Sequence, residues 1–196
     1  MEPRAAFFDD VFHRRRILPH DKQKQRVREK LLDILLCLNV SQFESLMGQL
    51  LQALEYDDIR IMRAVHPHRR SHKGRNRHGG FDLSARSSSF SPSLTLVQAK
   101  QYKRPVSRRF VDELRGAMIR QGAQSGLLIT ISRFSDKTKA SARENALLPI
   151  TLLNGEQLLD LLFHFSLGVR GRPGKRHWLW RLDRLFFHHL IPNAEN

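Results

Sequence analysis

Three polar residues, Asp82, Gln98 and Lys100, stand within or beside apolar segments and have side chains suited to catalysis. The segment LTLVQAK at 94–100 is short and apolar and follows a Ser-rich stretch, which predicts a buried strand. Because successive side chains of a strand point to opposite faces, Gln98 and Lys100 emerge on the same face. A buried ammonium group needs a carboxylate or an opening to solvent. Asp82 is the natural carboxylate, since the two glycines before it leave room for a close approach.

An aspartate, an amide oxygen and a lysine at one sheet edge suit the hydrolysis of a phosphodiester. Mg²⁺ or Mn²⁺ takes oxygen ligands, here the Asp82 carboxylate, the Gln98 amide oxygen and the Ala99 backbone carbonyl. The metal would activate a bound water, and Lys100 would orient that water or stabilise the developing negative charge. The structural alternatives are an Asp82–Lys100 ion pair and a strand glutamine bonded to a loop. Buried ion pairs give little net stability, which favours the catalytic interpretation.

Hydrophobic periodicity predicts the elements that must position these residues. Helices are expected at about 21–38, 42–54, 108–121, 136–146 and 156–165, and strands at 59–62, 81–83, 94–100, 126–132 and 150–153. From residue 81 onward strands and helices alternate, which favours an α/β sheet whose later strands are parallel. We divide the chain into an N-terminal helical extension (1–40), a central domain (41–168) and a basic, aromatic C-terminal extension (169–196).

Helix-cap patterns bear on a fourth site candidate, Glu44. Ser41 and Glu44 have the spacing of a capping box, which would explain Glu44 without any metal, so the structural and active-site interpretations are evenly balanced. Ser107 is expected to cap the helix that follows it. Gln121 stands one helical step from Met118, and a helix-surface glutamine is favoured over a site residue.

The charge of the chain points to a polyanionic partner. Lys and Arg number 34 against 19 Asp and Glu, which gives a net charge of +15 and a pI near 11.1. DNA is therefore the first expectation. No apolar run reaches the roughly 18 residues that a membrane span needs, and the N-terminus lacks a secretory signal, so we expect no membrane role and a cytoplasmic location. The single cysteine, Cys37, lies in an apolar run and is expected in the core.

Basic residues flank the presumed site on both sides. The segment 63–80 holds six Lys or Arg and four His and no acid. Its histidines (His66, His68, His72 and His78) lack a rigid helical pair, so a phosphate-gripping loop is favoured over a metal site. Such contacts would make binding salt-dependent. The expected nucleic-acid-binding residues are Arg69, Arg70, Lys73, Arg75, Arg77, Lys103, Arg104, Arg108 and Arg109.

The C-terminal extension begins with the linker-like VRGRPGKR and continues into HWLWRLDRLFFHHLI, which could form an amphipathic helix. Its aromatic side chains, Trp178, Trp180, Phe186 and Phe187, could stack on unpaired bases. Docking on the parent domain or on a partner is favoured, because aromatic residues along an amphipathic tail more often do this.

Five segments resemble, in order and spacing, the Mrr-like catalytic domain of restriction endonucleases: FESLMGQLL, GGFDL, VQAKQY, VDELRGAMIRQGAQSGLLITISRFS and ITLLNGEQLLDLL. The resemblance covers roughly residues 41 to 163. That family belongs to the PD-(D/E)xK nuclease superfamily, many of whose members carry Gln where Gln98 stands here. The resemblance implies a mixed central sheet flanked by helices, and a site of Asp82, Gln98 and Lys100 with Glu44 as an accessory acid.

The resemblance also implies a function, a Mg²⁺- or Mn²⁺-dependent DNA endonuclease in bacterial restriction or anti-phage defence. Two departures motivate an alternative. His78 stands where relatives commonly carry an acid, and the 40 N-terminal residues do not easily accommodate the winged-helix-like DNA reader of the Mrr proteins. The alternative is a catalytically weak or inactive nuclease-fold subunit that binds DNA and scaffolds partners. A homodimer, or a larger defence complex joined through 169–196, is the protein assembly we expect.

Overall fold

A five-stranded mixed sheet forms the centre of the computed structural model, which describes residues 22–62, 79–87, 92–174 and 178–190. Its strands are, in spatial order, β1 (Tyr56–Ile61), β2 (Leu83–Ser87), β3 (Leu94–Lys100), β4 (Ser125–Thr130) and β5 (Ile150–Leu153). The first three strands pair antiparallel, whereas β3, β4 and β5 pair parallel. The predicted fold class and the parallel later strands are therefore confirmed.

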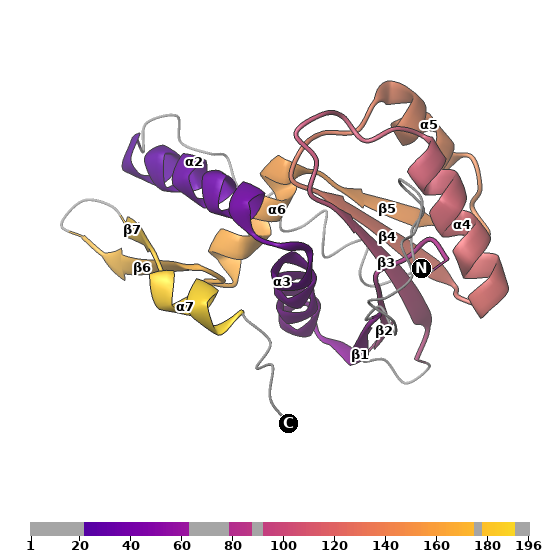
Figure 1. Cartoon of the computed structure of the whole chain (residues 1–196), viewed down its shortest axis with the longest axis horizontal. Helices are drawn as coiled ribbons and strands as arrows, with labels where there is room; N and C mark the ends of the chain where they lie inside the picture. The colour runs from indigo at the N-terminus through magenta and orange to yellow at the C-terminus, as the bar shows by residue number, and fades with distance from the viewer. Residues whose placement is uncertain (1–21, 63–78, 88–91, 175–177, 191–196) are drawn as a thin grey trace, which may run out of the picture.

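Helices cover both faces of this sheet (Figure 1). One apolar cluster joins α3 (Val40–Ala53) and α6 (Gly155–His164) to Val97 and Ile129, and a second joins α4 (Arg109–Gln121) and α5 (Asp136–Arg143) to Leu96 and Leu128. Neighbouring residues of one strand thus enter different clusters, as the period of two requires. Within the described residues, no helix combines the length and apolar character needed to cross a membrane.

The caps of two helices differ from the predicted ones. Asn39, in extended backbone, caps α3: its side-chain oxygen accepts the N–H of Gln42 at 2.9 Å, and Gln42 Oε1 accepts the N–H of Asn39 at 3.0 Å. The predicted capping box of Ser41 and Glu44 is wrong. Asn39 and Gln42 have the same three-residue spacing, stand two residues earlier and form the box instead. The predicted Ser107 cap is also wrong: α4 begins after Arg108 without a side-chain cap bond.

Helix α2 (Lys22–Cys37) is fastened to α6 by a buried arginine. Arg28 pairs with Asp160 and with Glu156, each at 2.6 Å, and its side chain is 8% exposed. Leu31 and Leu35 lie fully buried along the same face. Cys37 is exposed, so its predicted place in the core is wrong. Two residues beyond Leu35 is about 200° around a helix, which turns Cys37 to the opposite side.

The C-terminal residues form a hairpin and a short helix instead of the predicted linker and amphipathic helix. Strands β6 (Val169–Pro173) and β7 (Trp178–Leu182) pair antiparallel, and α7 (Arg184–His189) follows. The ring of Trp180 lies 4.9 Å from that of Phe163 on α6, and Phe186 and Phe187 pack against the same cluster. Docking on the parent domain is therefore confirmed for these three aromatic residues of the tail, while the side chain of Trp178 lies outside the described part.

A glycine at the start of the hairpin provides a test of this docking. Gly168 has a φ of 75°, and a Cβ there would lie 2.3 Å from the ring of Phe187. Gly122 has a φ of 64° with no atom within 4 Å of such a Cβ. In chemical denaturation, Gly122→Ala should cost about 1–2 kcal/mol for the left-handed backbone. Gly168→Ala should cost about 1–3 kcal/mol more, from overpacking. Equal losses would contradict the Phe187 contact.

Candidate active site

Asp82 lies immediately before β2, where its backbone and side chain both bond to neighbouring strands. Its N–H donates to the Val97 carbonyl at 2.8 Å, and its carbonyl accepts the N–H of Met62 at 2.9 Å. Its carboxylate oxygen Oδ2 accepts the N–H of Ala99 at 2.8 Å. These bonds fix the carboxylate against β3, one residue from Lys100. Gly80 provides the predicted close approach, although toward α4: a Cβ there would lie 2.7 Å from the Glu113 carbonyl oxygen.

Lys100 points from the end of β3 into a largely buried position. Its Nζ lies 3.9 Å from Asp82 Oδ2 and 5.2 Å from the ring centroid of Phe110, and its side chain is 8% exposed. The hydroxyl of Thr130 donates to the Lys100 carbonyl at 2.8 Å and anchors the strand end. A carboxylate and the face of an aromatic ring both attract the ammonium group and hold it at this position.

Gln98 is fully buried, and neither polar atom of its amide has a hydrogen-bond partner among the described residues. Leaving a buried polar group unsatisfied costs about 1–3 kcal/mol. Such a group in a folded protein calls for an explanation, for example a water or an ion that completes it. Within the described residues the amide of Gln98 therefore keeps its bonding capacity unused, on the strand face that Gln98 shares with Lys100.

Glu44, in the second turn of α3, comes close enough to this cluster to interact with it. Burial is the largest cause that raises the pKa of its carboxyl, to about 7; the charge of Asp82 raises it further and that of Lys100 lowers it. Because Asn39 and Gln42 supply the cap of α3, the capping explanation for Glu44 no longer holds. The structure thus brings Asp82, Lys100 and Glu44 close enough to interact, and Gln98 stands two residues before Lys100 on the same strand.

The other predicted residues divide into three groups. Lys103, Arg104, Arg108 and Arg109 are exposed on the segment that follows β3, and the Arg109 guanidinium lies 4.6 Å from the ring centroid of Phe110. Gln121 is exposed at the end of α4, as a helix-surface residue should be. The remaining ones lie outside the described residues: Arg69, Arg70, Lys73, Arg75, Arg77 and the histidines of the same loop, His66, His68, His72 and His78.

Sequence patterns did not identify three residues that support the cluster. Phe110 and Thr130 reach Lys100 from α4 and β4, and Gln101 Nε2 donates to the carbonyls of Leu35 and Leu38 at the end of α2, at 2.5 Å and 2.7 Å. Each contact joins segments at least ten residues apart, so spacing along the chain carried no signal for it.

The donor set fits a hard divalent cation bound through oxygen. Within the described residues no group of three or more His, Cys, Asp and Glu is gathered, so a cation here would need oxygen ligands beyond the two carboxylates. Two carboxylates, Asp82 and Glu44, are close enough for one to raise the pKa of the other, and the amide of Gln98 offers an unpaired oxygen. Two acidic groups and a carbonyl-type oxygen are ligands that Mg²⁺ accepts while retaining waters.

The fold and this cluster correspond to a known class of protein. Residues 35–162 match the family model Mrr_cat, described as restriction endonuclease. The chain belongs to this family, as the sequence resemblance predicted.

A relative and two solved structures agree with the family match. The type IV methyl-directed restriction enzyme EcoKMrr of Escherichia coli (strain K12) is 26% identical over 153 residues, 76% of this chain and 46% of that enzyme. The MspJI restriction endonuclease in complex with a 27-mer oligonucleotide has a TM-score of 0.54 at 19% identity, over 74% of this chain and 32% of that one. The DNA modification-dependent restriction endonuclease AspBHI has a TM-score of 0.54 at 20% identity, over 78% and 40%. The chain spans about half or less of the length of each.

The raised pKa of Glu44 predicts a pH-dependent loss of stability. The folded state holds a proton that the unfolded chain releases between about pH 4.5 and pH 7, so stability falls as pH rises through that window. Glu44→Gln removes this penalty. Its thermal unfolding midpoint should exceed that of the wild type increasingly from about pH 5 to about pH 8. Glu29→Gln, exposed on α2, is the control for losing one charge, and a pH-independent difference for Glu44→Gln would contradict the assignment.

Proposed function

We propose that this chain is the catalytic part of a metal-dependent DNA endonuclease. The observation that carries the proposal is the convergence of Asp82 and Lys100, 3.9 Å apart, beside the unpaired, fully buried amide of Gln98. A buried ammonium, a carboxylate and an unsatisfied amide are unfavourable for stability. Their position where β2 begins and β3 ends is better explained by a substrate and a cation than by packing.

The chemistry follows from the positions of these groups. Asp82, Glu44, Gln98 and the Ala99 carbonyl would hold Mg²⁺ or Mn²⁺. A bound divalent cation lowers the pKa of a coordinated water and offsets charge on the scissile phosphate. Lys100, held by Asp82 and by the ring of Phe110, presents its ammonium Nζ to the negative charge that develops on the phosphate oxygens.

The basic surroundings support DNA as the substrate. Lys103, Arg104, Arg108 and Arg109 follow directly after the strand that carries Lys100, and all four are exposed. We propose that they bind backbone phosphates, together with the basic residues of 63–80, so that affinity falls steeply with salt.

The biological role we propose is the cleavage of modified foreign DNA in restriction or anti-phage defence. The similar proteins named as methyl-directed and as DNA modification-dependent support this choice of substrate. A homodimer or a larger complex joined through 169–196 stays a prediction. The aromatic residues Trp180, Phe186 and Phe187 of that segment already pack on the domain, which leaves its exposed Arg172 and Arg181 for such a contact.

Cleavage of plasmid DNA tests the proposed function. Plasmid from methylating and non-methylating hosts is incubated with Mg²⁺, Mn²⁺ or EDTA. Asp82→Asn and Lys100→Met should lower the cleavage rate about 100-fold or more, because each removes stabilisation of the charge that develops during the reaction. Thr151→Val, exposed on β5, is the matched surface control and should cut like the wild type.

Two results would count against this proposal. Unchanged cutting by Asp82→Asn and Lys100→Met would remove both residues from the mechanism. DNA binding without cutting, with every metal and every plasmid, would favour the alternative of a nuclease-fold subunit that scaffolds partners.

Thermal unfolding without DNA tests the metal separately from turnover. A ligand present at about 100 times its dissociation constant adds about 2.7 kcal/mol to stability. MgCl₂ should therefore raise the unfolding midpoint of the wild type, and Asp82→Asn should abolish the increase. Gln98→Glu adds a carboxylate to the ligand set, so MgCl₂ should raise the unfolding midpoint of this variant more than that of the wild type. A KCl series of matched ionic strength is the control, and an equal response to both salts would argue against a specific cation site.

A further inference from the structure

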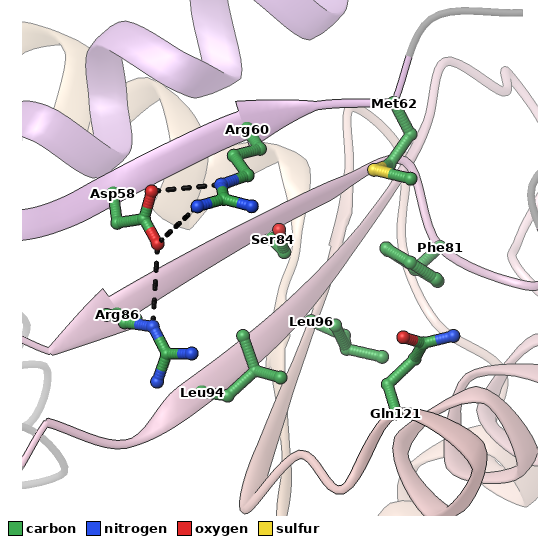
Figure 2. A pocket seen from close by; sticks show the side chains of 9 residues that line it. All are labelled: Asp58, Arg60, Met62, Phe81, Ser84, Arg86, Leu94, Leu96 and Gln121. Atoms are coloured by element: carbon green, nitrogen blue, oxygen red, sulfur yellow. Dashed lines mark hydrogen bonds and ion pairs between the residues drawn. The ribbon is translucent and has the colours of Figure 1, made fainter.

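A cavity of about 300 Å³ opens on the sheet beside the candidate active site (Figure 2). Its floor is apolar and its rim is polar. The residues that line it are Asp58, Arg60, Met62, Phe81, Ser84, Arg86, Leu94, Leu96 and Gln121. They come from β1, β2, β3, the segment before β2 and the end of α4. Among these residues Gln121 is the one that sequence patterns weigh as a site candidate, and they favour a helix-surface residue there.

The cavity begins one strand repeat from the candidate active site. Leu96 precedes Gln98 by two residues on the same face of β3, a step of about 7 Å. Phe81 is the residue before Asp82 and is almost fully buried. A polymer that is bound at Asp82 and Lys100 and runs along β3 toward Leu94 would reach this cavity.

One wall of the cavity holds two arginines beside a single acid. Asp58 accepts from Arg60 Nε at 2.9 Å and from its Nη2 at 3.2 Å, and its other contact is Arg86 Nε at 3.5 Å. Figure 2 shows the Asp58 carboxylate facing both guanidinium groups. All three side chains remain accessible, with 42% to 71% of their surface exposed. The wall therefore carries a net positive charge that an incoming anion can reach.

The backbone at Asp58, which directs this carboxylate toward the two arginines, has an unfavourable conformation. The pairing of β1 with β2 is irregular between Asp57 and Arg60, and Asp58 has a φ of 46°. A bulge of this kind re-aims a side chain. Strain of this type costs about 1–3 kcal/mol, whereas exposed ion pairs contribute about 0–1 kcal/mol. Stability therefore does not account for Asp58.

We propose that this cavity is a subsite for one nucleotide of the DNA strand next to the cut, an inference that rests on the proposed function. The phosphate binds the guanidinium groups of Arg60 and Arg86, which match its geometry. The sugar and base of that nucleotide pack on Met62 and Leu94, the partly exposed apolar residues of the lining. Asp58 holds the two arginines in position and competes with the phosphate for them, so it sets the affinity of the subsite.

Fluorescence anisotropy of a labelled duplex in EDTA tests the subsite without cleavage. Arg60→Ala and Arg86→Ala should each weaken binding, and each should reduce the slope of log K against log[KCl] by about 0.9. Ser84→Phe fills the cavity without a change of charge and should also weaken binding. Asp58→Asn should tighten binding about 3- to 10-fold by removing the competing charge, and asparagine tolerates the positive φ.

A matched control separates the subsite from general electrostatics. Asp33→Asn makes the same charge change on the exposed surface of α2 and should have a much smaller effect. In a background of Arg60→Ala with Arg86→Ala, Asp58→Asn should no longer tighten binding, because the pair it releases is gone.

The outcomes distinguish the subsite from the proposed function. Equal effects of Asp58→Asn and Asp33→Asn, or wild-type affinity and salt slope in Arg86→Ala, would overturn the subsite while leaving the nuclease intact. A wild-type protein that binds no DNA at any salt concentration would overturn both.

Discussion

The hydrogen bond from the Ala99 N–H to Asp82 Oδ2 is the contact on which the candidate site depends. A side-chain carboxylate here takes the place of a backbone carbonyl of the neighbouring strand, so β2 and β3 can separate without leaving a buried N–H unpaired. Lys100 lies at this point, and Glu44 of α3 is close enough to interact with Asp82 and Lys100. The carboxylate of Asp82 thus has two roles, because the oxygen that accepts the Ala99 N–H of the sheet is also the one that pairs with Lys100.

The polar groups of the site lower the free energy of unfolding, and the two apolar clusters on either side of the sheet offset this cost. Gln98 has no described partner for its amide, and the pKa of Glu44 is raised by burial and by Asp82. Each of these features costs free energy in the absence of a ligand. Fully buried leucines on α3, α4 and α6 hold the sheet between the clusters and keep the polar groups in place. The two apolar clusters therefore offset the free-energy cost of a polar centre in which the Gln98 amide has no described partner.

Sequence patterns predicted the strand that carries Gln98 and Lys100, because the run 94–100 is short, apolar and bounded upstream by a Ser-rich stretch. They left Glu44 evenly balanced between a helix cap and the site, since Ser41 with Glu44 has the same spacing as the observed cap of Asn39 with Gln42. The tail WLWRL alternates with the period of a strand, yet the longer segment HWLWRLDRLFFHHLI also fits an amphipathic helix, and the pairing with β6 decides between them. The contacts of Phe110 and Thr130 with Lys100 and the cavity at Asp58 are formed by residues from different elements. Spacing along the sequence therefore could not predict them.

Gln101 connects helix α2 to β3, the strand that ends in Lys100. Its amide holds the carbonyls of Leu35 and Leu38 at the end of α2, one residue after Lys100. Arg28 anchors the same helix to α6. Helix α2 is therefore attached at one point to α6 and at another to the residue that follows Lys100. The position of α2 and the end of β3 are thus coupled through one side chain, that of Gln101.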